Sequence, residues 1–464
     1  MLLVILAGVV VVDVILDVQV TGSLETYTSA GDVGVVSLPP APVALAAAEN
    51  DCSTGLLDVI YTYVDGNNSR WSDKFQAFAT QEGPQKQRLL LFDGANRFAD
   101  HGELMFSLRS VAMHWQDWET YVRRVIVVTD SQHPGFVRRD AADVVPPLHV
   151  VDHREIWRDP RHLPVFNSFA IESQILQMEN LSSVFVLSND DMFWGKSIDP
   201  RQLWSPTAGP FFFLEQHLWA EFAHATRAPH VSELSAVAVA SKILDHAFVW
   251  RARPYLAHAP RVIVRDVARE MVARFQKEIG DCGGHRFRDA SDVHIPFLAV
   301  MFHMERFGEE VARCAGVANS ADAAVSQWLT ERAVPHIWQD KMRIAILTRP
   351  MSLESFARIR HDCRGAAAYV YHTQAEGGSE PVTWDLLMVS YPPAPNFPGR
   401  LSEAFGATIF CLNDDTGGLA SNAQLWESLI GARLWQLLPV SSLWETTFSA
   451  AAGHGNDGSH DAHA

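Results

Sequence analysis

Short apolar segments alternate with longer amphipathic segments through the first half of the chain. Two segments, residues 103–118 and 167–177, repeat apolar side chains at helical spacing. Four runs rich in Val, Ile, Leu and aromatic residues are typical of β-strands: residues 57–64, 124–129, 148–151 and 184–187. Because strands of this length alternate with helices, the pattern predicts an α/β fold with a mostly parallel, Rossmann-like sheet flanked by helices.

Polar residues stand where these strands are expected to end. Six of them follow a predicted strand directly: Asp65, Asp130, Asp152, Asn189, Asp190 and Asp191. Ligands of open α/β sheets gather beyond the carboxyl ends of the strands, so we expect these side chains to line one crevice. Each residue also has a structural alternative, because acidic residues at strand ends cap the helix that follows.

The adjacent residues Asp190 and Asp191 have the chemistry of a divalent-cation site. Hard ions prefer oxygen ligands and usually bind through one or two carboxylates together with substrate phosphates. A second Asn-Asp-Asp triplet, residues 413–415, follows another apolar segment. Either triplet could instead form a turn, which Asn and Asp favour. The sequence therefore predicts a Mg²⁺ or Mn²⁺ site at Asp190 and Asp191.

Two further clusters carry residues suited to phosphate chemistry. His258, in "YLAHAPRVIVRD", lies two residues before Pro260, which holds the residue between them extended and so fixes the loop. Arg288 and Asp292 lie in "GGHRFRDASDVH", and arginine is suited to bidentate phosphate contacts. The alternatives are a structural histidine and a solvated charged loop.

Both ends of the chain differ from its centre. The chain starts "MLLVILAGVVVVDVILDVQVTGS", an apolar run with no preceding Lys or Arg. We interpret residues 1–50 as a hydrophobic segment, a candidate signal anchor, followed by a Pro/Ala-rich stem. Residues 51–448 would form one large catalytic domain, and residues 449–464 a disordered tail. A buried or truncated piece is the alternative for the first segment, which is short for a span of roughly 20 residues.

Composition narrows the classes of function. The 464 residues carry a formal net charge of −17, and Lys and Arg do not cluster. We therefore expect no nucleic-acid partner, because nucleic-acid binders show a basic patch. The cysteines show no metal-binding spacing, so we do not expect zinc to bind through sulfur; they are Cys52, Cys282, Cys314, Cys363 and Cys411.

Several blocks of the chain resemble, in the same order, the conserved blocks of the Stealth family. That family comprises bacterial capsular-polysaccharide sugar-phosphate transferases and the eukaryotic GlcNAc-1-phosphotransferase that builds the mannose-6-phosphate tag. "DVIYTYVDG" resembles the first block, and the stretch from "NRFADHGELMFSLRSV" to "SNDDMFWG" resembles the second. "AHAPRV" and "HRFRDASDV" are similar to the third block, and "FCLNDD" to the short fourth.

The resemblance implies roles for particular residues. Asp190 and Asp191 would lie at the metal and the diphosphate, and Glu172, His258 and Arg288 match active-site residues of the family. The nucleotide sugar would be bound by residues drawn from several blocks: Asp65, Asp100, Glu103, Ser107, Arg109, Asn189 and Asp292.

The reaction that the resemblance implies is transfer of a hexose-1-phosphate from a UDP-sugar, such as UDP-GlcNAc, to a hydroxyl of a glycan or glycoprotein, with release of UMP. Arg288 would hold non-bridging phosphate oxygens. His258 is the expected base for the acceptor hydroxyl, and Glu172 is either a competing base or a ligand that orients the sugar. The resemblance also suggests a lumenal domain at the Golgi membrane, and a homodimer is one expected assembly.

Two other functions stay open at this point. One is a metal-dependent glycosyltransferase, which would release UDP rather than UMP. The other is a non-catalytic glycan-binding subunit, because Ala99 and Met105 stand where the family has arginines. His101 and Phe169 also replace the family's Asn and His, so the identity of the donor is in question.

Overall fold

The computed structural model describes most of the central part of the chain. The described residues are 56–206, 209–220, 232–248, 252–317, 365, 368–369, 371–373, 384–390, 396–415 and 426–446. The chain divides into two units, Met1–Pro42 and Val43–Ala464, and all the described residues belong to the second. The expected signal anchor, the stem and the tail lie outside the described residues, so the domain boundaries stay a prediction.

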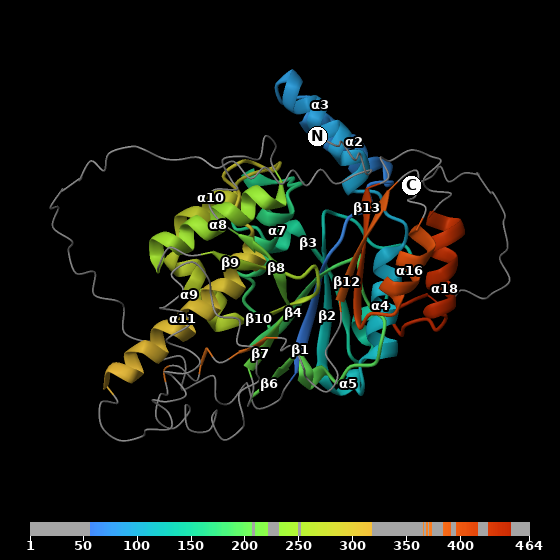
Figure 1. Ribbon diagram of the computed structural model, residues 1–464. Coiled ribbons are helices and arrows are strands. Elements are labelled where there is room, and N and C mark those ends of the chain that lie inside the picture. Colours follow the sequence, from blue (N-terminus) through green and yellow to red (C-terminus); the bar gives the residue numbers. More distant parts are fainter. Residues whose placement is uncertain are drawn as a thin grey trace, which may run out of the picture. The chain divides into compact units, whose positions relative to one another are not determined.

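A five-stranded sheet forms the centre of the fold (Figure 1). Its strand order is β10-β4-β1-β2-β3, in which β10 is antiparallel to β4 and the other neighbours are parallel. The bounds are β1 Leu57–Thr62, β2 Val122–Thr129, β3 Leu148–Asp152, β4 Val184–Asn189 and β10 Arg261–Val264. The four predicted strands therefore form, and the predicted mostly parallel α/β fold is confirmed.

Alternate residues of the strands face two different helical layers. Ile60 of β1 packs with side chains of α7 (Ser168–Ile175), α8 (Glu233–Ala247) and α11 (Ile295–Val317). Val59 and Tyr61 point the other way and pack with Leu104 and Leu108 of α4 (Glu103–His114). Because side chains alternate along a strand, one apolar strand supplies both cores. Figure 1 shows α8 and α11 on one side of the sheet and α4 on the other.

The predicted helices form with shorter bounds. α7 begins after Asn167, whose side chain accepts a hydrogen bond from the backbone N–H of Phe169. α4 ends at His114 rather than continuing to residue 118, because Trp115 is extended and buried, with its ring 5.3 Å from that of Trp194. A separate short helix, α5, covers Trp118–Tyr121.

A second sheet joins a distant part of the chain to the end of β4. Its order is β12-β13-β5, with bounds Trp384–Ser390, Ile409–Asp415 and Met192–Trp194. β5 follows Asp191 directly, and β13 pairs antiparallel with it so that Cys411 lies opposite Met192. The backbone N–H of Leu412 also donates to the Asp191 carbonyl, at 3.1 Å. β13 is thereby fixed beside the carboxyl end of β4.

The other elements complete these layers. Two small sheets, β11-β7-β6 and β8-β9, lie beside the main ones; their strands are β6 Trp204–Ser205, β7 Gly209–Phe212, β8 Leu214–Ala220, β9 Arg253–Leu256 and β11 His372–Thr373. The other helices are α2 Ser69–Ala79, α3 Pro84–Arg97, α6 His153–Ile156, α9 Arg265–Arg274, α10 Gln276–Gly283, α16 Phe397–Phe405 and α18 Ala432–Leu437. Within the described residues, no helix combines the length and the apolar character needed to span a bilayer.

Candidate active site

A cavity of about 340 Å³ lies at the carboxyl ends of β1 and β4, with Thr62 and Asn189 in its lining. The chain leaves β1 towards β2 and β3 on one side, whereas β4 lies on the other side of β1. In open α/β sheets this reversal of strand order leaves a crevice in which ligands bind. The volume is also within the range of small-molecule sites, roughly 300–1,000 Å³.

Acidic side chains crowd one part of the cavity. Burial raises the pKa of Asp190 well above its usual value, and the charges of Asp191 and Asp100 raise it further. Burial also raises the pKa of Glu103, with added contributions from Asp100 and Asp190. Oδ1 of Asp191 is buried and has no hydrogen-bond partner among the described residues. A cation bound here would relieve this repulsion between like charges.

His258 faces these carboxylates from the loop between β9 and β10. Its Nε2 lies 4.0 Å from Oδ2 of Asp191. The loop is fixed because the N–H of Ala257 donates to the carbonyl of Phe213 at 2.9 Å, and Pro260 follows. Burial lowers the pKa of His258, although the charge of Asp191 opposes that shift. The imidazole is therefore neutral at pH 7 and can accept a proton.

Three arginines line the cavity as well: Arg97, Arg261 and Arg288. Arg288 donates from Nη2 to Oγ of Ser168 at 3.2 Å, and its guanidinium lies 4.7 Å from the centre of the Phe169 ring. Arg261, the first residue of β10, is buried, and its Nη1 contacts Sδ of Met192 at 3.7 Å. Nε of Arg261 has no hydrogen-bond partner in the part of the chain that the structure describes. These side chains can offer N–H donors to an anion in the cavity.

Glu172 of α7 lines the cavity on the side of the arginines. It is buried, and its Oε2 has no hydrogen-bond partner within the described ranges. Burial raises its pKa, whereas the charges of His294, Arg261 and Arg288 oppose the shift. The N–H of Phe297 lies 3.1 Å from Nδ1 of His294, and Nε2 of His294 lies 3.2 Å from Oε1 of Glu233, so both contacts fix the imidazole in place.

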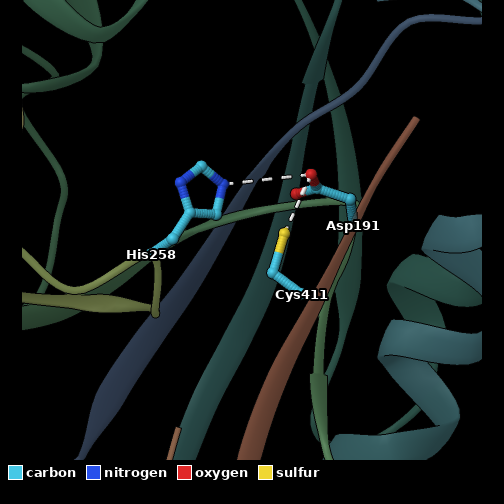
Figure 2. Close-up of side chains that lie close together, drawn as sticks. All are labelled: Asp191, His258 and Cys411. Atoms are coloured by element: carbon cyan, nitrogen blue, oxygen red, sulfur yellow. Dashed lines mark hydrogen bonds and ion pairs between the residues drawn. The ribbon is translucent and has the colours of Figure 1, made fainter. Parts of the chain in front are cut away.

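One group of side chains has the arrangement of a metal site. Asp191, His258 and Cys411 offer three ligand atoms that all lie within 4.8 Å of one another. Figure 2 shows them converging from three separate segments. Sγ of Cys411 donates to Oδ2 of Asp191 at 3.1 Å. Burial raises the pKa of the Cys411 thiol, and the charge of Asp191 adds to that effect.

The structure brings together some of the residues that the sequence selected. Seven of them line the cavity: Glu103, Glu172, Asn189, Asp190, Asp191, His258 and Arg288. Five do not line it: Asp65, Asp100, Ser107, Arg109 and Asp292. Each of those five forms a hydrogen bond or an ion pair with another part of the fold.

Ser107 and Arg109 are buried on α4, away from the cavity. Oγ of Ser107 donates to the Met192 carbonyl at 2.5 Å. Arg109 pairs with Glu445, its Nη2 lying 2.6 Å from Oε2. Their side chains join α4 to β5 and to Glu445, and their contact with the nucleotide sugar stays a prediction.

Asp65, Asp100 and Asp292 form hydrogen bonds with residues that lie close to the site. Asp65 accepts the N–H of Asn67 at 2.9 Å and so forms a turn. Asp100 accepts the hydroxyl of Tyr63, a cavity residue, at 2.7 Å. Asp292 is buried and accepts from Nδ2 of Asn167 at 2.8 Å, which joins the Arg288 loop to the start of α7. None of these three carboxylates is in the lining of the cavity, and their contact with the nucleotide sugar stays a prediction.

Of the other residues at strand ends, some line the cavity and some do not. Asp130 lines the cavity, where Lys74 pairs with it at 2.8 Å. Asp152 instead caps α6 and shares a capping box with Glu155, so for this residue the structural alternative holds. In the second triplet, Asn413 lines the cavity, and the side chains of residues 414 and 415 are outside what the structure describes.

The sequence alone assigned no role in the site to Trp71, Arg261, His294 or Cys411, although His294 ends the segment "GGHRFRDASDVH". Arg261 and Cys411 stand inside two of the segments that resemble Stealth blocks, "AHAPRV" and "FCLNDD". Neither has a local pattern that marks it. The spacing between cysteines does not point to Cys411, because the side chains grouped with it, Asp191 and His258, lie far away in the chain.

Comparison with known proteins agrees with the blocks found in the sequence. Residues 97–212 match the model of Stealth protein CR2, conserved region 2, and residues 257–305 match that of Stealth protein CR3, conserved region 3. The resemblances at residues 58–66 and 410–415 lie outside these two matches.

Similar curated proteins are bacterial polysaccharide phosphotransferases. An exopolysaccharide phosphotransferase of Streptomyces coelicolor is 32% identical over 52% of this chain and 38% of its own length. A capsular polysaccharide phosphotransferase of Haemophilus influenzae is 27% identical over 55% of this chain and 67% of its own. The chain thus spans well under two thirds of the Streptomyces relative. The match to the structure of mouse xyloside xylosyltransferase 1 covers 76% of this chain and 96% of that protein at 9% sequence identity. Its TM-score of 0.23 is too low to support an inference.

The bacterial origin of these relatives corrects one expectation. The Golgi-membrane location that the resemblance suggested is contradicted, because the similar proteins come from organisms such as Streptomyces coelicolor and Haemophilus influenzae. The resemblance itself is confirmed, because two segments of the chain match the models of conserved regions 2 and 3 of the Stealth proteins.

Proposed function

We propose that this chain transfers a sugar-1-phosphate from a UDP-sugar to a hydroxyl group of a glycan and releases UMP. The observation that carries the proposal is the convergence of carboxylates with His258, Arg261 and Arg288 in one cavity at the reversal of strand order. Phosphoryl transfer depends chiefly on positioning and on charge stabilisation, which such a set can supply. The names of the bacterial relatives support phosphotransfer to a glycan.

Asp190 and Asp191 would hold a Mg²⁺ or Mn²⁺ ion. The residues fit such an ion, because Oδ1 of Asp191 is buried without a partner among the described residues and because burial, together with the charge of Asp191, raises the pKa of Asp190. When bound, the ion neutralises charge on the diphosphate and on the departing UMP. Glu103 lies close enough to Asp190 to add to the negative potential that attracts a cation.

Arg261 and Arg288 would hold the non-bridging oxygens of the transferred phosphoryl group. Both guanidiniums are already positioned, Arg288 by Ser168 and Phe169 and Arg261 by Met192. Preorganised donors stabilise the charge that develops in the transition state without reorganising during the reaction. Phe169 stands where the family commonly has His, and in this chain its ring supports Arg288.

His258 would take the proton of the acceptor hydroxyl. The acceptor oxygen then forms a bond to the phosphorus that carries the sugar, the bond from that phosphorus to UMP breaks, and the proton passes to His258. Burial keeps the imidazole neutral beforehand, and the Asp191 carboxylate 4.0 Å away stabilises the imidazolium that forms. Glu172, whose pKa is raised by burial, would orient a sugar hydroxyl and is the competing base. The donor sugar, a homodimer and a membrane anchor stay predictions from the sequence.

The test is a screen of UDP-sugars with Mg²⁺ or Mn²⁺ and a glycan acceptor, in which UMP and UDP are measured separately. We expect UMP release that disappears with chelator and in Asp191→Asn. Asp152→Asn is the matched control, because Asp152 is also a strand-end carboxylate but caps α6. Release of UDP would replace the proposal with sugar transfer. Glycan binding without turnover of any donor would replace it with a binding subunit.

A further inference from the structure

We propose that Asp191, His258 and Cys411 form a site for a thiophilic divalent cation, with Zn²⁺ as the representative ion. Such an ion would occupy the site in place of the hard cation that supports transfer. The consequence for activity rests on the proposed function, but the binding itself does not.

The geometry of the three side chains carries this inference. Sγ of Cys411 lies 3.1 Å from Oδ2 of Asp191, and Nε2 of His258 lies 4.0 Å from the same oxygen. All three ligand atoms are within 4.8 Å of one another, a separation that a single ion can bridge with small side-chain movements. Figure 2 shows the imidazole, the carboxylate and the thiol directed toward one another.

The backbone already holds these residues in place. Cys411 lies in β13 opposite Met192, and Leu412 donates to the carbonyl of Asp191. His258 comes from the loop that Pro260 ends. Nε2 of His258 and Oδ1 of Asp191 have no hydrogen-bond partner among the residues described, so a ligand could use both without breaking an existing bond. Only the thiol has to give up a hydrogen bond.

The chemistry of the donor set selects the class of ion. Sulfur, imidazole nitrogen and carboxylate oxygen are the three donors that zinc uses in proteins, and three protein ligands leave a fourth position open. Mg²⁺ instead prefers oxygen ligands and near-octahedral geometry, so a thiolate gives it no advantage. Soft thiolate ligands favour zinc over magnesium and calcium. The site is therefore expected to discriminate strongly between the two kinds of ion.

Binding of the ion would change protonation but not oxidation state. The S–H bond of Cys411 breaks as the metal–sulfur bond forms, and the proton leaves to water. His258 binds through the lone pair of Nε2, with its proton on Nδ1. Asp191 and His258 are then both ligands of the thiophilic ion, so neither is available for phosphotransfer. Zinc should accordingly inhibit an enzyme that works with Mg²⁺.

Cobalt provides a direct test, because Co²⁺ replaces zinc and its bond to a thiolate gives a charge-transfer absorption band. We expect the metal-free full-length protein to show this band on titration with Co²⁺ and to lose it on addition of Zn²⁺. The band should be absent in Cys411→Ser. It should persist in Cys282→Ser, the matched control, because Cys282 is a buried free cysteine on α10 that does not belong to the group formed by Asp191, His258 and Cys411. No band in the folded protein, or a band unchanged in Cys411→Ser, would overturn the proposal.

Zinc affinity, measured by competition with a chelating dye, provides a second readout. His258→Gln keeps the thiol and should weaken zinc binding by about 100-fold, because even changes behind a ligand cost roughly 10–100-fold. Circular dichroism verifies the fold of each variant. Equal affinity in folded His258→Gln would contradict the site. A cobalt band in a protein that turns over no donor would leave this site standing while the proposed function fails. Transfer activity without a band would do the reverse.

Discussion

Asp58 and Asp191 lie at opposite ends of the same pair of parallel strands, β1 and β4. Asp58 has an exposed fraction of 0%, and Nε of Arg123 and the N–H of Ser182 donate to it at 2.8 and 2.9 Å. Oδ1 of Asp191 has no hydrogen-bond partner within the described chain, and Oδ2 accepts only from a thiol. Asp58 thus has hydrogen-bond partners at one end of the sheet, whereas one carboxylate oxygen of Asp191 has none among the described residues at the other end.

This difference separates a structural carboxylate from a functional one. A buried carboxylate that is fully paired contributes to the folded state, because removal of its partner leaves an uncompensated charge. Carboxylates that are crowded and unpaired destabilise the fold unless a ligand compensates them. The unsatisfied polar atoms of Asp191, His258, Glu172 and Arg261 all belong to residues of one cavity, which is the physical reason to locate the chemistry there.

The largest expected effect is that substitution of Asp191 lowers activity but not stability, whereas substitution of Asp58 lowers stability. Asp191→Asn should lower kcat/KM by about 1,000-fold, as expected for loss of a main electrostatic contact, without lowering stability. Asp58→Asn should lower the free energy of unfolding by about 2 kcal/mol, less than for a fully buried pair because Arg123 is partly exposed. Steady-state kinetics and urea unfolding of both variants measure this. Comparable losses of stability in both would mean that Asp191 is structural.

An intermediate effect is expected for two buried arginines. Arg261→Met should lower kcat/KM by about 100-fold and leave stability unchanged or raised, because it removes a buried cation whose Nε has no hydrogen-bond partner among the described residues. Arg253→Met should do the opposite, because Nη1 and Nη2 of Arg253 pair with Asp245 and Glu305 at 2.6 and 2.9 Å. Steady-state kinetics and urea unfolding of both variants test this prediction. Full activity in folded Arg261→Met would exclude the residue from phosphate binding.

The smallest expected effect is a pH dependence of stability caused by His153, which lines the cavity from the start of α6. Burial lowers its pKa from 6.5 to about 4, against the opposing charges of Asp130 and Asp152. Because the folded value lies below the unfolded one, this contribution to stability is complete above pH 6.5 and is lost as the pH falls towards 4. Between pH 7 and 5 the loss should be about 1–2 kcal/mol.

Urea unfolding at a series of pH values, compared with His153→Gln, isolates that contribution. The variant should lose less stability than the native chain over the same interval. Parallel curves for the two proteins would show that His153 is not the group responsible.

The sequence by itself determined the local elements and the positions of some functional groups within them. Runs of β-branched residues gave β1 to β4, because a strand buried on both faces is apolar throughout. The polar triplet after the last of these runs located Asp190 and Asp191 beyond a strand end, where α/β proteins bind ligands. Asn167 marked the start of α7, which carries Glu172.

Only the tertiary structure decided which of these groups meet. An apolar period gives the length of a strand and its faces, but it does not name the neighbouring strand. The order β10-β4-β1-β2-β3 brings His258 and Arg261 beside Asp191. The pairing of β13 with β5 adds Cys411 from 220 residues further along the chain. Asp152 and Arg109 belong to residue types that are equally suited to a site. Asp152 instead caps a helix and Arg109 forms a buried ion pair, because neighbouring residues provide their hydrogen-bond partners.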